Sequence, residues 1–185
     1  MSLVYIIGKM ITLPGTYIKT FWEHLMCRIL KIPVETENYL HYDISLGHVE
    51  HEFAKTLPRS FLLCWIPGVL NKLFGIVMLM AGSLGIFYLG VEPVNRAASG
   101  ITDWLFYAYL VLLYLGISLL CNIFPLVEDA LLVWEKLYSG NGAKLIWKIL
   151  LFIPSACMVA GAYIEQYSIN ILLAAGFVVF GYLYK

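Results

Sequence analysis

The sequence predicts an all-α integral membrane bundle of about five transmembrane helices, with a small cytoplasmic β-element between the first two. Hydrophobic residues make up 61% of the 185 residues and charged residues only 13%, whereas a soluble domain is about half apolar and about a quarter charged. The mean hydropathy is +0.82. A chain with so little charge cannot keep its surface hydrated, so we expect lipid around most of it. At this length we expect a single membrane domain.

Five segments come close to the length of about 20 mostly apolar residues that a spanning helix needs. They are Leu3–Leu30, Phe61–Gly90, Ile101–Phe124, Leu145–Ile164 and Ile169–Tyr184. Pro14 and the glycine after it are expected to bend the first segment, and Pro67 with its glycine to break or kink the second. A break inside a membrane frees backbone groups that need partners within the protein, so we expect the Pro67 region to face the bundle.

Two polar stretches divide these helices. Residues 31–59 contain short, partly alternating runs, which predict two or three small strands. Residues 126–143 carry apolar residues at helical spacing and then a glycine-rich turn, which predicts an amphipathic cytoplasmic segment. The predicted order is a first helix (1–30), the β-element (31–59), two helices (60–125), the amphipathic segment (126–143) and two helices (144–185).

Lysine and arginine predict the orientation, because loops rich in these residues stay in the cytoplasm. Those around the two polar stretches are Arg28, Lys31, Lys55, Arg59, Lys136, Lys144 and Lys148. The opposite loops hold only Arg96. We therefore expect both polar stretches and the C-terminus in the cytoplasm and the N-terminus outside. The formal net charge is zero, so no basic field indicates nucleic acid.

The histidines lie within one stretch of the chain, where His48-Val49-Glu50-His51-Glu52 combines two imidazoles with two carboxylates. Zinc uses these ligands when thiolates are absent. On a helix His48 and His51 would share a face and could chelate an ion together. On a strand they would point to opposite faces, so the predicted strand argues against chelation. The alternative is a solvated polar loop.

A second polar group follows the third predicted span. Asn122 and Pro125 are expected to unwind the end of that helix and to direct the acidic side chains after it. A carboxylate such as Asp129 is costly at this depth unless a cation, a metal or a hydrogen-bond network satisfies it. The alternative is an ordinary helix cap at the membrane interface, with Asp129 in water.

A third pair lies in the first helix, where Lys19 and Glu23 are four residues apart. Side chains at this spacing can pair on one helix face. The alternative is that Lys19 extends along the helix to the lipid headgroups.

Together these features resemble the site-2 protease-like membrane metalloproteases, above all their small bacterial and archaeal members of the zincin type. Those proteins carry, in order, Pro-Gly, a helical HExxH, Cys-Arg, Gly-x-x-x-His-Glu, a proline-kinked helix and Phe-Pro-x-x-x-Asp-Ala. The corresponding residues here are Pro14-Gly15, Cys27-Arg28, Gly47 to Glu52, Pro67 and Phe124 to Ala130. The resemblance covers residues 10–135 and implies a bacterial cytoplasmic membrane protein.

The chain departs from that family at the catalytic motif. HExxH falls on Lys19-Thr20-Phe21-Trp22-Glu23, so both histidine ligands and the glutamate base are missing. In these enzymes zinc polarises the carbonyl and activates a water, while the glutamate transfers the proton. Protonated Lys19 cannot ligate a cation and Thr20 cannot act as a base near neutral pH, which leaves only Glu23. A shift of one residue to His24 gives no HExxH either.

The departure leads to two hypotheses for the site. In the first, Lys19 and Asp129 form a buried ion pair where the family holds zinc. In the second, an alternative metal site is built from Glu23, His24, His48 or His51, and Asp129.

For function we expect a non-catalytic pseudoprotease scaffold that needs no cofactor and binds another membrane protein or a lipophilic ligand within the lipid bilayer. The alternative is a zinc-dependent intramembrane peptidase with unusual ligands. Transport is a third class, but the helices hold too few polar residues for a continuous path. They also lack the repeats and paired broken helices typical of transporters.

Overall fold

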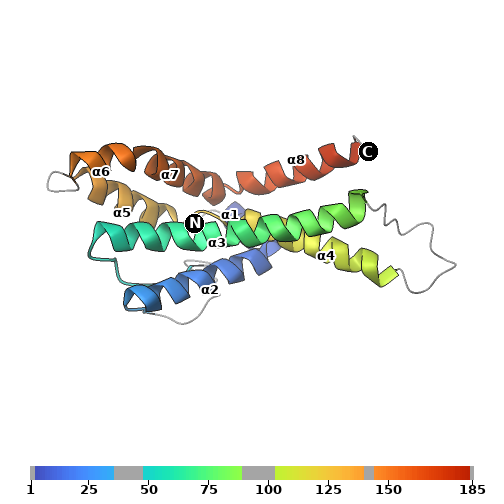
Figure 1. Ribbon diagram of the computed structural model, residues 1–185, viewed down its shortest axis with the longest axis horizontal. Helices are drawn as coiled ribbons and strands as arrows, with labels where there is room; N and C mark the ends of the chain where they lie inside the picture. The colour runs from blue at the N-terminus through green and yellow to red at the C-terminus, as the bar shows by residue number, and fades with distance from the viewer. Residues whose placement is uncertain (1–2, 36–47, 89–102, 140–143, 184–185) are drawn as a thin grey trace.

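The computed structural model describes residues 3–35, 48–88, 103–139 and 144–183, which are helical apart from short connections (Figure 1). The elements are α1 (Leu3–Ile11), α2 (Leu13–Leu30), α3 (Leu57–Ser83), the π-helical turn η1 (Leu84–Tyr88), α4 (Asp103–Leu120), α5 (Val127–Tyr138), α6 (Leu145–Leu150), α7 (Phe152–Gln166) and α8 (Ile169–Leu183). The prediction of an all-helical chain is confirmed.

Three lines of helices run along the molecule (Figure 1). α3 and η1 form the first line, α4 and α5 the second, and α6, α7 and α8 the third. The end of α2, the start of α3, the end of α5 and the start of α6 lie at one end of the bundle, which we call the α2 end. The ends of η1 and α8 and the start of α4 lie at the other end, which we call the α8 end.

The course of α7 and α8 does not support the two separate crossings expected after residue 144. The helices follow one another in the same direction, so the end of α8 lies opposite the α2 end (Figure 1). Only Tyr167 and Ser168 separate them, and Ser168 adopts a left-handed backbone with φ 56°. The short junction shifts the helix axis without reversing it. The expected count of five spans is therefore not supported by this arrangement.

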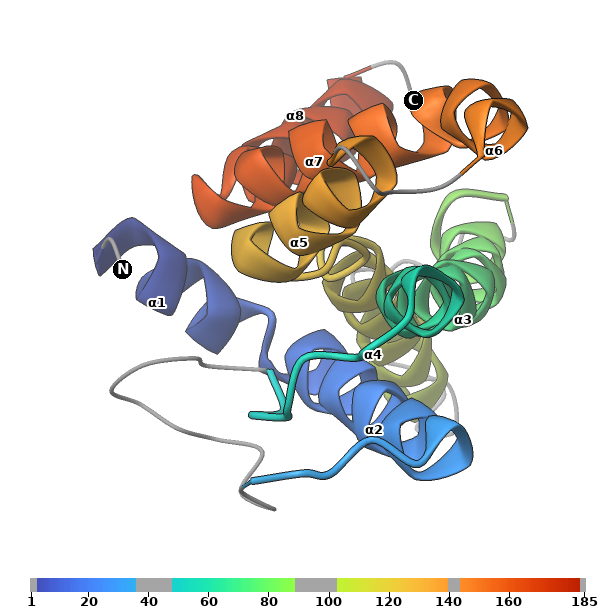
Figure 2. The same ribbon diagram turned by 90° about the vertical axis from the view of Figure 1, so that its left-hand side faces the viewer.

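The first predicted helix is divided at Thr12. α1 lies across the bundle and α2 runs along it (Figure 2). Pro14 occupies the first turn of α2, where its missing N–H costs no helical hydrogen bond. The chain therefore bends in the region that the sequence indicated.

α3 is continuous through Pro67, so the break that was one of our two expectations does not occur there. This part of the helix does face the bundle, as we expected. A side chain at Gly68 would place its Cβ 2.0 Å from the Ile123 carbonyl oxygen, so the connection after α4 packs directly on the helix backbone. Asn71 Nδ2 donates to the carbonyl of Asn122 at 2.8 Å. These contacts hold α3 against the α4–α5 connection.

In the described residues the β-element is reduced to one antiparallel bridge between Val34 and His51. Pro33 precedes the bridge and has no N–H with which to extend a ladder. Residues 36–47 of the predicted β-element lie outside the described residues. The bridge nevertheless fixes the connection that contains His48 and His51 beside the end of α2.

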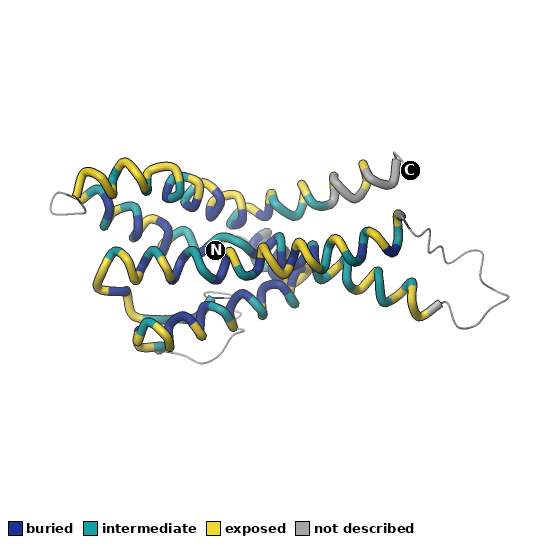
Figure 3. The backbone as a smooth tube through the Cα atoms, in the orientation of Figure 1, coloured by how far each residue is buried: buried dark blue, intermediate teal, exposed yellow. Residues whose placement is uncertain are grey.

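The distribution of polar residues is unusual for a water-soluble bundle. Among the described residues, as many polar or charged side chains are buried as hydrophobic ones, and large hydrophobic side chains are exposed on every helical line. The buried positions gather along the middle of the molecule (Figure 3). By length and composition, one described helix, Leu57–Phe87, is able to cross a membrane.

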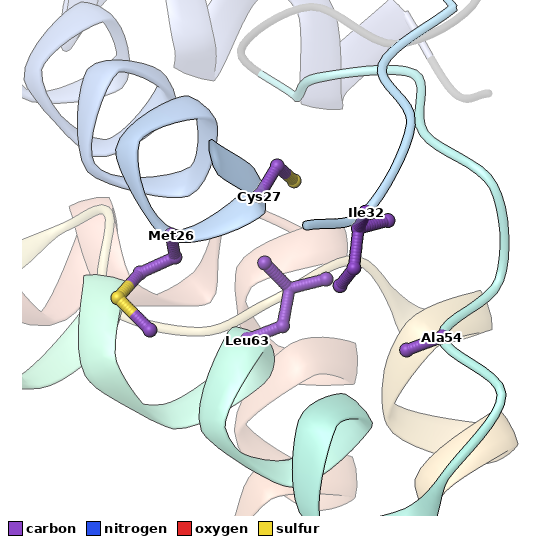
Figure 4. Close-up of a cluster of buried hydrophobic side chains, with 5 residues drawn as sticks. All are labelled: Met26, Cys27, Ile32, Ala54 and Leu63. Atoms are coloured by element: carbon purple, nitrogen blue, oxygen red, sulfur yellow. The ribbon is translucent and has the colours of Figure 1, made fainter. Parts of the chain in front are cut away.

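A small apolar cluster fixes the connection before α3. It joins the end of α2, the start of α3 and the extended chain between them (Figure 4). Its buried members are Met26, Cys27, Ile32, Ala54 and Leu63. Burial of such side chains contributes about 1.5–3 kcal/mol each for the larger ones. The cluster therefore anchors the chain on both sides of residues 48–51.

A second apolar cluster sets the position of α5 between α3 and α7. Its buried members are Cys64, Ala130, Val133, Met158 and Ala162. Ala130 directly follows Asp129, so the packing of this helix face also determines where the Asp129 carboxylate lies.

The close crossing of α2 and α4 gives a test of this packing. A Cβ on Gly15 would lie 2.1 Å from the Ser118 carbonyl oxygen, so Gly15→Ala should separate the two helices and lower the free energy of unfolding by about 1–3 kcal/mol. A Cβ on Gly176 meets nothing within 4 Å, and Gly176→Ala should leave stability unchanged or slightly higher. Thermal unfolding in detergent measures both; equal loss in the two variants would contradict the packing.

Candidate functional site

One face of α1 and α2 carries buried polar side chains at spacings of three and four residues, which place them in a row. They are Lys9, Thr12, Thr16, Lys19, Thr20 and Glu23. The hydroxyl of Thr20 donates to the Thr16 carbonyl at 2.9 Å, so the helix itself satisfies it. The hydroxyl of Thr16 lies within hydrogen-bond distance of two acceptors, the Thr12 carbonyl at 2.9 Å and Asn122 Oδ1 at 3.1 Å. The charged groups of this face are the two lysines and Glu23.

Glu165 on α7 connects this face to the rest of the bundle. Its Oε1 lies 2.5 Å from Lys9 Nζ and 3.6 Å from Lys19 Nζ. Its Oε2 accepts hydrogen bonds from the backbone N–H groups of Ile123 (3.1 Å) and Phe124 (2.9 Å). One buried carboxylate thus contacts two ammonium groups and two backbone amides that lie beyond the end of α4.

Lys19 does not form the ion pair that we hypothesised. Its ammonium lies 3.6 Å from Glu23 Oε1 and 3.6 Å from Glu165 Oε1, and it also donates to the Phe124 carbonyl. Among the ion pairs of the described residues, Asp129 pairs with His48 instead. Glu165 takes the place expected for Asp129 because α7 brings it directly over this face of α2.

Asn122 and Pro125 lie in the connection between α4 and α5, where the sequence predicted an unwound helix end. Asn122 Oδ1 accepts hydrogen bonds from Lys9 Nζ (2.6 Å) and Thr16 Oγ1 (3.1 Å). Its Nδ2 donates to the Ser118 carbonyl at 2.8 Å. The non-helical connection therefore contacts the buried Lys9 through Asn122. Pro125 follows in the same connection, two residues before α5 begins.

His48 links the interior to the acidic end of α5. Its Nδ1 lies 3.0 Å from Glu23 Oε2 and its Nε2 lies 3.4 Å from Asp129 Oδ2. Burial disfavours the charged imidazolium, but the Glu23 and Asp129 carboxylates outweigh that effect, so the pKa of His48 is raised above its ordinary value. The two carboxylates therefore stabilise the protonated form of His48 relative to an isolated imidazole.

The remaining histidines differ in their positions. The rings of His48 and His51 lie 5.2 Å apart in an edge-to-face arrangement. His24 contacts Arg28 instead, with Arg28 Nε 3.2 Å from its Nε2. His41 lies outside the described residues. Of the metal ligands considered from the sequence, the structure brings His48, His51 and Asp129 together, with Glu23 behind His48.

A cavity of about 600 Å³ opens in front of this group. Its acidic lining residues are Glu35, Glu50, Glu128, Asp129 and Glu165. The described lining residues include no lysine and no arginine. The cavity thus presents carboxylates and imidazoles to a ligand, while the lysines stay buried behind it.

Sequence reasoning missed Lys9 and Glu165. Each is the one charged residue of a short apolar helix, and such a residue inside a predicted span is itself a signal of an interior partner. The two lie 156 positions apart, so nothing local indicates that they meet. Comparison of the chain with family models, with curated proteins and with solved structures finds no match.

The partners of Lys19 can be tested with double-mutant cycles. Lys19→Met leaves Glu23 and Glu165 without one of their cations, and we expect a loss of about 3–5 kcal/mol in the free energy of unfolding. Adding Glu23→Gln should restore part of this loss, because the removed charge no longer needs a partner. Adding Asp129→Asn should restore less. A larger recovery with Asp129→Asn would contradict the pairing described above.

Proposed function

We propose that the chain is an integral membrane protein whose interior is polar and whose surface faces lipid. The buried charges and the exposed apolar side chains support this, because lipid is the solvent in which such a surface is stable. The helix Leu57–Phe87 has 31 residues and extends about 46 Å at 1.5 Å per residue. The hydrocarbon core is about 30 Å thick, so the ends of this helix extend into the headgroup regions.

We propose that each of the three lines of helices crosses the membrane, with α1 and α2 packed against them. The lysines and arginines that predicted the orientation flank elements at the α2 end of the bundle, including Arg28 at the end of α2 and Lys148 in α6. The positive-inside rule places that end in the cytoplasm. The end of α8 then lies on the outer side, whereas the sequence predicted a cytoplasmic C-terminus.

A reporter fused after Lys185 tests this orientation. We expect alkaline phosphatase, which is active only outside the cytoplasm, to be active in this fusion and green fluorescent protein to be dark after Sec-type export. A fusion of the same reporters at Ser139, which follows α5 at the α2 end, serves as the control and should give the reverse pattern. Equal behaviour of the two fusion sites would contradict the single course of α6, α7 and α8 through the membrane.

The same protein is proposed to be a non-catalytic member of the site-2 protease-like type. The resemblance places the family's HExxH on α2, and there Lys19 is paired with Glu23 and Glu165. Together with Lys9, which also pairs with Glu165, they form a buried group of two lysines and two glutamates. A lysine in an ion pair supplies neither a metal ligand nor a base. We therefore infer that Lys19 stabilises the fold and takes no part in peptide hydrolysis.

The binding partner that the cavity favours is a cationic segment of another membrane protein. The observation that carries this proposal is the acidic lining of the cavity, in which Glu35 and Glu128 are exposed. Segments beside the cytoplasmic ends of transmembrane helices are rich in lysine and arginine. Complementary charge raises the association rate and selects against acidic partners.

Binding of a fluorescent lysine-bearing peptide to the protein in phosphatidylcholine nanodiscs tests this function. We expect saturable binding that weakens with salt, and Glu35→Gln/Glu128→Gln should weaken it by about tenfold, which corresponds to roughly 1.4 kcal/mol. Glu135→Gln is the matched control, because Glu135 is exposed on the same helix but does not line the cavity. Binding that is equal for a glutamate-bearing peptide, or equal in the two variants, would reject the proposal.

A further inference from the structure

We propose that His48, His51 and Asp129 form a zinc site at the mouth of the acidic cavity. One ligand atom from each residue lies within 4.8 Å of the other two. His48 and His51 come from the connection before α3, and Asp129 comes from the first turn of α5. The inference goes beyond the proposed binding function and does not depend on the cationic partner.

The two imidazoles are oriented as zinc ligands usually are. His48 Nδ1 lies 3.0 Å from Glu23 Oε2, and His51 Nδ1 lies 3.0 Å from the backbone oxygen of Glu52. A zinc-bound histidine commonly donates a hydrogen bond from its second ring N–H to a carboxylate or a backbone carbonyl, which fixes the tautomer and the ring orientation. Both histidines therefore keep Nε2 for a metal ion, with a carboxylate behind one and a carbonyl behind the other.

The distance between two of the ligand atoms suits tetrahedral zinc. Zinc binds nitrogen and oxygen ligands at about 2.0–2.2 Å, and two such ligands at a tetrahedral angle are then about 3.3–3.6 Å apart. His48 Nε2 and Asp129 Oδ2 are 3.4 Å apart.

The donor set selects the class of metal. Calcium and magnesium prefer oxygen ligands, whereas two imidazoles and one carboxylate suit zinc and other divalent transition metals. Zinc binds such sites more tightly than divalent iron does. The cavity in front of the three residues leaves room for a further ligand of the ion.

The site differs from the one that the family resemblance implies. At the HExxH position on α2, the Lys19 ammonium contacts Glu23, Glu165 and the Phe124 carbonyl, so these residues do not fit a zinc ion. The proposed site lies on the other side of Glu23, where His48 separates Glu23 from Asp129. The buried ion pairs and the zinc site therefore occupy different places.

The test is isothermal titration of ZnCl2 into the detergent-purified protein, after removal of any polyhistidine tag and of bound metal with a chelator. We expect one zinc ion per chain with micromolar or tighter affinity. His51→Ala and Asp129→Asn should each weaken binding by at least tenfold. Glu52→Gln is the matched control, since it keeps the backbone oxygen that contacts His51, and it should bind like the unchanged protein.

Thermal unfolding of each metal-free variant identifies any variant that has lost its fold. His51 is only partly buried, so His51→Ala should unfold near the temperature of the unchanged protein and its loss of zinc should be a direct effect. Absence of saturable zinc binding in the unchanged protein would overturn the site. Binding that persists in the folded His51→Ala and Asp129→Asn variants would overturn it as well, because the zinc would then be held elsewhere.

Discussion

The Glu165 carboxylate joins α1, α2 and the connection between α4 and α5 at one point in the interior. It pairs with Lys9 on α1 and Lys19 on α2 and accepts the amides of Ile123 and Phe124. In a lipid environment each of these groups would be costly without a partner. This carboxylate satisfies two backbone amides in the non-helical connection between α4 and α5. The direction of α5, and with it the position of Asp129, depends on the same interaction.

His48 marks the boundary between two electrostatic regions. Behind it, two lysines and two glutamates alternate and leave the interior neutral. In front of it, carboxylates face an open cavity with no lysine or arginine among the described lining residues. The interior thus stabilises the fold, while the excess of negative charge is confined to the surface that a ligand can reach. A zinc ion and a cationic segment would each satisfy a different part of that excess.

Local sequence patterns predicted the features that depend on residues close together in the chain. The helical content, the bend near Pro14, the unwound end at Asn122 and the amphipathic character of α5 follow from hydropathy, proline and residue spacing. The pairing of Lys9 with Glu165 was not predictable, because it joins residues 156 positions apart.

The sequence did not predict that α8 continues in the direction of α7, and the reason is different. This course depends on the left-handed backbone of Ser168, which few residues other than glycine adopt and which serine does not signal. The predicted strand also misled the reading of His48 and His51. The bridge at His51 is isolated, so the chain turns enough to bring both rings to Asp129.

The separation of Lys9 and Glu165 along the chain also has a consequence for biosynthesis. At about 5–20 residues per second, a ribosome completes Glu165 roughly 8–30 seconds after Lys9. During that time α1 and α2 have no carboxylate from α7, and each lysine would cost about 2.5–3.5 kcal/mol at the centre of the bilayer. In the membrane arrangement proposed above, the first two helices would wait near the headgroups, or in a hydrophilic channel of the insertion machinery, until Glu165 has been made. Entry of the N-terminal helices into the bundle would then be a late step of assembly.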